Sequence, residues 1–239
     1  MMNAPVVWSY WEGGRRPFIT KCLGSIARVC GNALHLVTPM NIGDYLPNGH
    51  LHPAIKNLRE PAWRADVIRA ALLATHGGFW IDADTVMLRP PWHLATDHDL
   101  VHAVWDNSPR RVFNGYIYAR PGSALACEWL RGVNASLDAN PRGDKWTGLG
   151  EQVLTPLVDG GHYATREVPR STWCPLDVDR DVLKFFEPGD PVDYITEESV
   201  CFGLNNSWMM AHRREIMAMS AMEMRLSPLL IHRLLTEYA

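Results

Sequence analysis

The run Gly-Gly-Phe-Trp-Ile-Asp-Ala-Asp at residues 77–84 constrains the fold more than any other stretch of this chain. Residues 61–76 before it carry apolar side chains at roughly helical spacing, which predicts a helix. The glycine pair ends that helix, because glycine tolerates the positive φ of a helix C-terminus. Residues 79–82 then predict a short apolar strand. Asp82 and Asp84 are therefore expected where this strand stops.

Two carboxylates at positions i and i+2 beyond a strand can face one ligand if the backbone bends there. Their hard oxygen atoms suit Mg²⁺ or Mn²⁺, which proteins usually hold with few side chains plus substrate phosphates. In open α/β sheets, ligands bind beyond the carboxyl ends of the strands, where Asp82 and Asp84 are expected. The alternative is that both residues only form and cap a turn.

The rest of the chain alternates between strand-like and helix-like segments, which indicates one α/β domain with a mixed, mainly parallel central sheet flanked by helices. The length of 239 residues also suits a single domain. The expected strands are residues 6–11, 34–37, 79–82, 100–105, 115–119 and 200–203, and the expected helices are 17–29, 61–76, 123–137 and 150–158. Residues 168–186 are expected to be irregular with two short strands, and the tail from residue 211 to be largely helical.

Charge, cysteines and hydropathy exclude several classes of protein. The formal net charge of −3 gives no strong basic field that would draw the chain to nucleic acid. Five scattered cysteines fit reduced thiols, and no secretory signal or long apolar segment is evident, so a cytoplasmic location is expected. The C-terminal residues 226–238 are amphipathic. They either dock on the core or form a helix that contacts a partner or the inner face of a membrane peripherally.

Asp66 and Arg69 lie three residues apart on the expected helix before the glycine pair, so they share one helix face. The commoner explanation for this spacing is a surface ion pair, which stabilises little. The alternative is a binding role, in which Arg69 donates to sugar hydroxyls or a phosphate and Asp66 accepts from hydroxyls.

The combined pattern resembles a known family. From Trp63 the sequence reads Trp-Arg-Ala-Asp-Val-Ile-Arg, followed by Leu73, the glycine pair, two aromatic residues and Asp-x-Asp. This block is similar to the donor-site signature of sugar transferases with the Asp-x-Asp motif. These include glycosyltransferase family 32, the capsular polysaccharide synthesis proteins and, more distantly, the clostridial glucosylating toxins. Weaker likeness at residues 7–13, 17–25, 41–47 and 205–208 extends the resemblance over about residues 5–208.

The resemblance implies a GT-A fold, a nucleotide-sugar donor, Mn²⁺ or Mg²⁺, and transfer of a hexose with retention at the anomeric carbon. It divides the single domain 1–239 into a nucleotide-sugar and metal-binding half (5–120), an acceptor and closing-loop half (121–210) and a helical tail (211–239). Three departures from the family pattern are visible. Ala65 replaces a serine, Asn205 stands where histidine is frequent, and Leu149 replaces the proline of a Thr-Gly-Pro loop.

The resemblance also implies a role for each matching residue. Asp84 is the expected direct metal ligand, and Asp82 bridges the donor and the metal shell. Asp66 and Arg69 hold the donor sugar. The other expected site residues are Trp8 stacking on the nucleobase with Tyr10 beside it, Asn205 at the metal, Ser207 and Trp208 at the diphosphate, Asn114 facing the donor sugar, and Trp146, Thr147, Gly148, Glu151 and Gln152 on the acceptor side. For Asn114 a turn, and for residues 146–152 a plain loop, are the structural alternatives.

The leading functional hypothesis is a metal-dependent transferase that moves a sugar, most often from a UDP donor, to a glycan or lipid-linked acceptor. One alternative is the modification of a macromolecule, either a protein or hydroxylated phage DNA. Another is a catalytically silent sugar-nucleotide binder. A metal-dependent phosphohydrolase fits less well, because no further carboxylate or histidine cluster accompanies the Asp-x-Asp pair. The arginine pairs 110–111 and 213–214 are either solvated or meet an anionic acceptor.

Overall fold

A computed structural model describes residues 4–105, 109–142, 148–176, 181–206, 209–210 and 213–239. The chain divides into two compact units whose segments interleave along the sequence. The first unit holds residues up to Glu12, His35–Ile81 and Trp92–Val168, and the second holds Gly13–Leu34, Asp82–Pro91 and Pro169–Ala239. The expected boundaries at residues 120 and 210 do not coincide with these limits, and the single domain stays a prediction.

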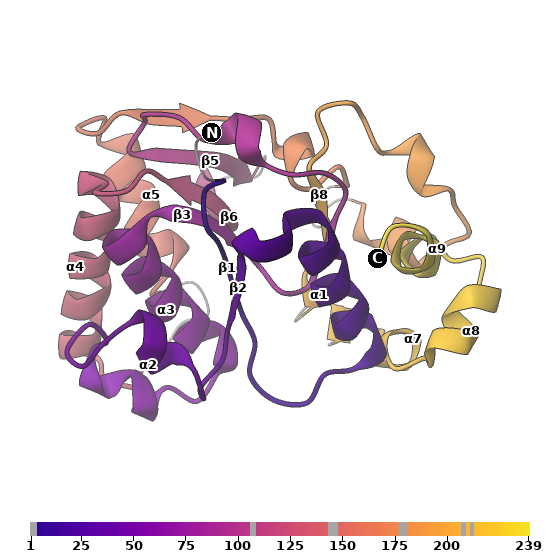
Figure 1. The fold of residues 1–239 in the computed structure, drawn as a ribbon, viewed down its shortest axis with the longest axis horizontal. Helices are drawn as coiled ribbons and strands as arrows, with labels where there is room; N and C mark the ends of the chain where they lie inside the picture. Colours follow the sequence, from indigo (N-terminus) through magenta and orange to yellow (C-terminus); the bar gives the residue numbers. More distant parts are fainter. Residues whose placement is uncertain (1–3, 106–108, 143–147, 177–180, 207–208, 211–212) are drawn as a thin grey trace. The chain divides into compact units, whose positions relative to one another are not determined.

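The first unit is built on a six-stranded sheet with the order β2-β1-β3-β6-β5-β7 (Figure 1). Strands β1 and β3 pair in parallel, as do β5 and β7, while β6 runs antiparallel to both β3 and β5. The elements of this unit are β1 (Val7–Tyr10), β2 (Leu34–Val37), α2 (Ile42–Tyr45), η2 (Pro53–Asn57), α3 (Pro61–His76), β3 (Gly78–Ile81), η3 (Trp92–Leu94), β5 (Leu100–Trp105), β6 (Arg111–Ala119), α4 (Ala124–Ala139), α5 (Glu151–Asp159) and β7 (Thr165–Glu167). The mixed α/β sheet flanked by helices confirms the expected fold class.

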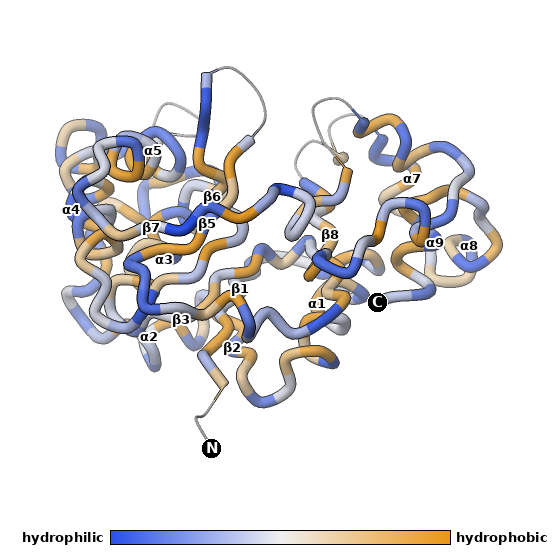
Figure 2. Tube along the Cα trace, turned by 90° about the horizontal axis from the view of Figure 1, so that it is seen from above, coloured by the Kyte–Doolittle hydropathy of each residue, from blue (hydrophilic) through white to orange (hydrophobic). Residues whose placement is uncertain are grey.

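Helices α3 and α4 pack against each other and against one face of this sheet (Figure 1). Their shared core includes the fully buried side chains of Trp80 on β3 and Trp129 on α4. A buried tryptophan removes roughly 150–250 Å² of surface from water, so these two rings contribute strongly to this layer. Apolar stretches along the neighbouring strands β5 and β6 are visible as orange segments in Figure 2.

The glycine pair ends α3 and begins β3, as expected from the sequence. Gly77 has φ 69° and Gly78 has φ 95°, a region that residues with a Cβ rarely adopt. A Cβ at Gly77 would lie 2.6 Å from the backbone nitrogen of Pro121, and one at Gly78 would lie 2.4 Å from Val6 Cγ1. Both the backbone conformation and the close packing therefore require glycine here, which fixes where β3 starts.

The second unit contains a two-stranded antiparallel sheet, β4 with β8, and helices. Its elements are α1 (Pro17–Cys30), η1 (Gly31–Ala33), β4 (Thr85–Met87), η4 (Arg170–Thr172), η5 (Val182–Phe186), η6 (Pro191–Asp193), β8 (Cys201–Gly203), α7 (Arg214–Met217), α8 (Ala221–Leu226) and α9 (Leu230–Glu237). Helix α1 packs on β4, and α9 packs on α1, α8, η5 and η6.

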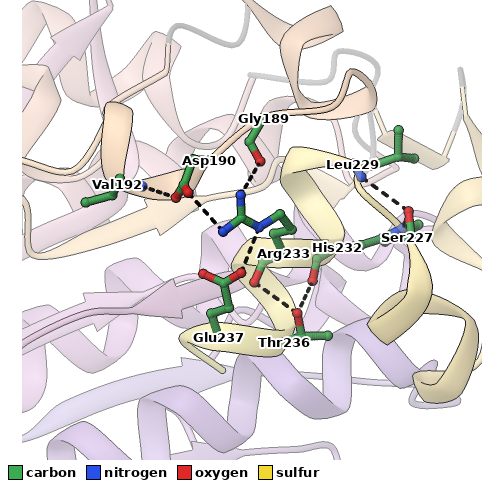
Figure 3. Close-up of polar contacts among 9 residues, drawn as sticks. All are labelled: Gly189, Asp190, Val192, Ser227, Leu229, His232, Arg233, Thr236 and Glu237. Atoms are coloured by element: carbon green, nitrogen blue, oxygen red, sulfur yellow. Dashed lines mark hydrogen bonds and ion pairs between the residues drawn. The ribbon is translucent and has the colours of Figure 1, made fainter.

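The C-terminal helix α9 docks on the core of the second unit. Leu230 and Leu234 are buried, whereas Leu226 on α8 is 79% exposed. Figure 3 shows how Arg233 on α9 contacts the segment before η6, donating to the carbonyl of Gly189 at 3.2 Å and pairing with Asp190 at 3.0 Å. The apolar face of α9 is thus buried by packing. Peripheral contact with a membrane would need this face to be exposed.

Two expectations about secondary structure were wrong. Strand β6 begins at Arg111 and not at residue 115, because the apolar run continues upstream through Val112 and Phe113. In residues 168–186 the described part contains the short 3₁₀ helices η4 and η5 and no strand, while the strand β7 precedes it at Thr165–Glu167. Within the part of the chain that the structure describes, no helix is both long and apolar enough to cross a membrane.

Candidate functional site

Asp66 and Arg69 form a buried ion pair on α3. Asp66 is 7% exposed and Arg69 4%, and Arg69 Nη1 lies 2.6 Å from Asp66 Oδ1. This pair is therefore not the exposed surface ion pair that is commoner at this spacing. Desolvating two charges costs several kcal/mol per ion, of the order of the gain from pairing, so a buried pair is weak evidence of a purely stabilising role.

Asn114 joins this pair from the middle of β6. Its side-chain amide donates to Asp66 Oδ1 at 3.0 Å, the same oxygen that receives Arg69. Asn114 therefore lies in a strand and not in a turn, which was its structural alternative. On the other side, Arg69 Cζ lies 4.7 Å from the centroid of the Trp80 ring, a cation–π contact that fixes the guanidinium above β3.

Gly150 closes the backbone against this cluster. A Cβ at this position would lie 2.1 Å from Asn114 Nδ2 and 2.8 Å from Asp66 Oδ1. Any other residue would displace Asn114 or Asp66, so Gly150 sets the positions of both polar side chains. The sequence offered no signal for this role, because a glycine in a Gly-rich loop more often serves a turn.

Glu151 follows Gly150 as the first residue of α5 and is 8% exposed. It accepts from Trp105 Nε1 at 2.9 Å and from Arg111 Nη1 at 3.4 Å. Both oxygens of its carboxylate thus accept hydrogen bonds from side chains of the first unit. Of the other expected acceptor-side residues, Gln152 is exposed and Gly148 is half-buried, while Trp146 and Thr147 lie outside the described residues.

The neighbouring Arg110 pairs with Asp159 and, at 2.6 Å, with Glu167. Since Arg111 pairs with Glu151, both arginines already have carboxylate partners in the folded chain. This arrangement does not favour the alternative in which the two arginines receive an anionic acceptor.

Trp8 does not offer a ring face to a ligand. It is 4% exposed, its Nε1 donates to the carbonyl of Gly77 at 2.9 Å, and its ring centroid lies 5.1 Å from that of His35 and 5.2 Å from that of His76. Tyr10 is 7% exposed, and burial followed by the charge of Glu12 raises its pKa. This burial does not favour the predicted stacking of Trp8 on a nucleobase, because β1 turns both Trp8 and Tyr10 into the core.

Trp11 is an aromatic residue that the site expected from the sequence did not include. It follows the last residue of β1, is only half-buried, and donates its backbone N–H to the carbonyl of Val37 at 3.0 Å. The next residue, Glu12, accepts from Arg64 Nε at 2.7 Å, so an ion pair to α3 fixes the chain beside Trp11. The position beyond a strand end was the available signal, because ligands of α/β sheets bind there.

Asp82 and Asp84 belong to the second unit and frame the turn before β4. Both are partly exposed, while the alternating residues Ala83 and Thr85 are buried, so the two carboxylates are on the accessible side of the turn. The carbonyl of Asp84 accepts from Leu204 N at 3.1 Å, and Asp84 Oδ2 accepts from Asn206 N at 2.5 Å. Asp84 thus caps the chain after β8.

Asn205 is exposed and has φ 50°, the sole positive φ of a non-glycine residue in the described ranges. Asparagine adopts this left-handed conformation more readily than most residues. Its carbonyl accepts from Met209 N at 3.1 Å. The pairing of Thr85 with Gly203 brings the segment after β8 to the Asp-x-Asp turn. Ser207 and Trp208 lie outside the described residues.

The donor set of the turn fits Mg²⁺ or Mn²⁺ better than zinc. Burial and then the negative charge of Asp84 raise the pKa of Cys22, so this thiol stays protonated. Two partly exposed carboxylates and an amide remain as hard oxygen donors, which suit these cations when substrate phosphates complete the shell. Over the described residues, no group of three or more His, Cys, Asp or Glu side chains is placed to hold a metal.

The fold defines the class of this chain as an α/β fold of the GT-A glycosyltransferase type. The solved structure named PaToxG glycosyltransferase aligns with a TM-score of 0.53 at 10% identity, over 66% of this chain and 71% of that one. A glycosyltransferase involved in the glycosylation of the major capsid of PBCV-1 aligns with a TM-score of 0.51 at 12% identity, over 91% of this chain and 100% of that one.

A sequence match covers the first part of the chain. Residues 1–110 match the family described as capsular polysaccharide synthesis protein, which confirms the resemblance stated above for this part of the chain. The matched residues include Asp66, Arg69, Asp82 and Asp84. No curated protein sequence matches the chain at a significant level.

Proposed function

We propose that this protein is a glycosyltransferase of polysaccharide synthesis that moves a sugar from a nucleoside diphosphate donor to a glycan or lipid-linked acceptor. One observation carries the proposal: a buried carboxylate, Asp66, is held by Arg69 and Asn114 in a chain of GT-A fold. Carboxylate and guanidinium groups fixed in this way are suited to reading the hydroxyls of a sugar ring. The family match over residues 1–110 supports the same activity.

In this proposal Asp66 accepts hydrogen bonds from donor-sugar hydroxyls, and Arg69 donates to the sugar or to the diphosphate. Asn114 and Gly150 act through Asp66, because they fix where its carboxylate lies. Arg69 stays in place through its contact with Trp80. The rigidity of the group favours catalysis, since preorganised polar groups cost no rearrangement when charge develops on the leaving group.

Mn²⁺ or Mg²⁺ is the proposed cofactor, held by Asp82 and Asp84 with Asn205 as a further oxygen ligand. When bound, such a cation neutralises the negative charge of a departing diphosphate. The partial exposure of both carboxylates and the hard oxygen donors of the turn support this assignment. Ser207 and Trp208 remain predicted partners of the diphosphate.

The donor nucleotide is proposed to be UDP, with Trp11 in place of Trp8 as the residue that stacks on the base. Trp11 is half-buried just beyond the end of β1, whereas Trp8 is 4% exposed. An aromatic face of this kind suits a planar base. Competition of a panel of nucleoside diphosphates against a fluorescent UDP analogue tests the base preference, and equal affinity for all bases would contradict it.

We also propose that a hexose is transferred with retention, by attack from the side of the leaving group. No additional carboxylate in the described ranges is assigned as a nucleophile, since Asp66 is paired with Arg69 and Glu151 with Arg111. Proton NMR of the first-formed product, recorded before anomers equilibrate, tests this. Inverted product would exclude the same-side mechanism.

The acceptor is proposed to be a glycan or a lipid-linked saccharide, in line with the family description. The second candidate is a macromolecular acceptor, because one structure of like fold is involved in glycosylating a capsid. Incubation with a radiolabelled donor and with separate glycan, lipid-linked and protein fractions distinguishes them by where the label appears.

The test of the proposed function is hydrolysis or transfer of UDP-sugars in the presence of Mn²⁺. A panel of UDP-sugars is first screened for thermal stabilisation, because a ligand that binds the folded state raises its stability. The best binder is then assayed for release of UDP. Clear binding of UDP without turnover of any sugar would favour the silent binder, and release of phosphate from simple esters would favour a phosphohydrolase.

A further inference from the structure

Ser25 lies on the buried face of α1 and is fully excluded from solvent. Its Oγ accepts from the backbone N–H of Met87 on β4 at 2.9 Å. The hydroxyl proton goes to the carbonyl of Cys22 at 2.6 Å, which is closer than the carbonyl of Thr85 at 3.3 Å. The Ser25 hydroxyl on α1 therefore accepts a backbone hydrogen bond of β4 that a neighbouring strand would otherwise accept.

We propose that Ser25 is a positioning residue for Asp84, holding β4 so that the Asp-x-Asp turn presents its carboxylates to a divalent cation. This inference rests on the proposed function. Strand β4 starts at Thr85, directly after Asp84, and has only three residues. A shift of so short a strand moves the turn that precedes it.

The other edge of β4 is already fixed. Thr85 pairs with Gly203 and Met87 with Cys201, and Asp84 itself accepts from Leu204 N and Asn206 N. These bonds set the register of β4 against β8. On the α1 side, Met87 N donates to Ser25 Oγ, which also lies 3.3 Å from the carbonyl of Thr85. Ser25 thus restrains β4 on the side that faces α1, whereas β8 pairs with its other edge.

Removing the hydroxyl would leave the N–H of Met87 without its acceptor in a buried place, which is unfavourable. The strand would relax toward another acceptor or admit a water molecule, and the Asp84 carboxylate would move with it. A general loss of stability is one consequence of any such change. A selective loss of cation affinity is the consequence that a positioning role predicts.

Ser199 provides a matched control in the same unit. It is also fully buried, and its Oγ accepts from Thr196 N at 3.1 Å and donates to the carbonyl of Ser171 at 3.3 Å. Ser199 precedes β8 at the end that pairs with Met87, whereas Asp84 lies at the opposite end of the β4–β8 pair. Ser199→Ala removes a comparable buried hydroxyl without touching the α1–β4 contact.

The experiment measures Mn²⁺ binding to the full chain in the presence of saturating UDP, from the loss of the free Mn²⁺ signal in electron paramagnetic resonance. Thermal unfolding of each variant is recorded alongside. Ser25→Ala is expected to weaken Mn²⁺ binding roughly three- to tenfold, the effect of losing part of one hydrogen bond. Ser199→Ala, at a similar loss of Tm, is expected to bind Mn²⁺ like the parent protein.

Ser25→Thr is expected to restore Mn²⁺ binding, since a threonine hydroxyl can bond the i−3 carbonyl of a helix and still accept from Met87 N. If Ser25→Ala is too unstable to purify, Ser25→Cys replaces it, because sulfur keeps the volume but accepts weakly. Unchanged Mn²⁺ affinity in Ser25→Ala or Ser25→Cys, or equal weakening in Ser199→Ala, would overturn the inference.

Asp84→Asn separates this outcome from the proposed function. If the parent binds no Mn²⁺ with UDP, or if Asp84→Asn binds it unchanged, the cation assignment itself fails and the inference with it. If Asp84→Asn loses binding while Ser25→Ala keeps it, only the positioning role of Ser25 is rejected.

Discussion

Asn114 on β6 donates its side-chain amide to the carboxylate of Asp66 on α3 across 3.0 Å, although 48 positions separate the two residues in the sequence. The bond links a strand to the helix that carries the acidic-basic pair. Because Arg69 reaches the same oxygen, the carboxylate is held from two elements at once. This fixed carboxylate is the centre of the proposed donor-sugar site.

Asp66→Asn is expected to lower kcat/KM for UDP-sugar turnover at least about a hundredfold, because the neutral amide loses the charge that holds Arg69 and accepts from sugar hydroxyls. Steady-state kinetics with Mn²⁺ measure this. Asp99→Asn is the matched control, since Asp99 is 7% exposed and pairs with Arg120 at 3.0 Å in the same unit. Equal loss in both variants would show that the effect is one of folding.

Gly150→Ala is expected to abolish most activity and to lower Tm, because its Cβ would overlap Asn114 Nδ2 and crowd Asp66. Gly43→Ala serves as control, since a Cβ there meets nothing within 4 Å and its φ is not positive. Activity and thermal unfolding of both variants are compared. A fully active Gly150→Ala protein would contradict the close backbone approach described for this position.

Trp11→Ala is expected to weaken UDP binding roughly tenfold with little loss of stability, as base stacking on an aromatic side chain contributes about 1–3 kcal/mol. Trp8→Ala is expected to lower Tm strongly instead, because this ring is buried and bonded to Gly77. Isothermal titration with UDP, next to unfolding curves, tells the two apart. Loss of UDP affinity in a well-folded Trp8 variant alone would reverse the assignment.

Asp84→Ala is expected to remove Mn²⁺-dependent turnover and also to loosen the chain after β8, since Asp84 Oδ2 accepts from Asn206 N. Asp84→Asn keeps an acceptor for this N–H and should retain more of the stability while still losing turnover. Hydrogen exchange at residues 204–206 and assays over a Mn²⁺ series measure the two effects. Turnover that persists without Mn²⁺ in either variant would contradict the cation assignment.

His232 makes stability depend on pH. Burial lowers its pKa from the ordinary value of 6.5, and its ring bonds Ser227 at 2.7 Å and the carbonyl of Ile216 at 3.2 Å (Figure 3 shows His232 on α9). Below pH 6.5 the unfolded state binds the proton better, so stability is present above this pH and is lost as the pH falls toward the folded pKa. His232→Gln should have a lower Tm at pH 7.5 but a smaller decline on acidification to pH 5.5.

A decline in Tm that is equal in the parent and in His232→Gln would assign the pH dependence elsewhere. His102 is the other described histidine whose pKa is lowered, again chiefly by burial, so the His102→Gln variant is measured in parallel. Additive effects are expected, because His102 lies on β5 of the first unit and His232 on α9 of the second.

Local pattern was enough to predict the α/β class, helix α3 and its glycine end, because helical periodicity and positive φ are properties of neighbouring residues. The same reasoning placed Asp82 and Asp84 at a strand end. It left a turn open as the alternative for Asn114, because an Asn-Gly pair favours a turn locally, whereas the pairing of β6 with β3 and β5 places this residue in a strand. The burial of Trp8 could not be predicted for a related reason, since the packing of the two faces of a strand decides which of its residues are exposed.

The sequence by itself determined the fold class, the likeness of residues 1–110 to the capsular polysaccharide synthesis proteins and the residues from which a donor site is proposed, because these are carried by periodicity and by motif. The tertiary structure decided which of them are available and what holds them. Burial put Trp8 into the core, strand pairing delivered Asn114 to Asp66, and packing between α1 and β4 brought Ser25 to Met87. Each depends on contacts between residues far apart in the chain, which no local pattern specifies.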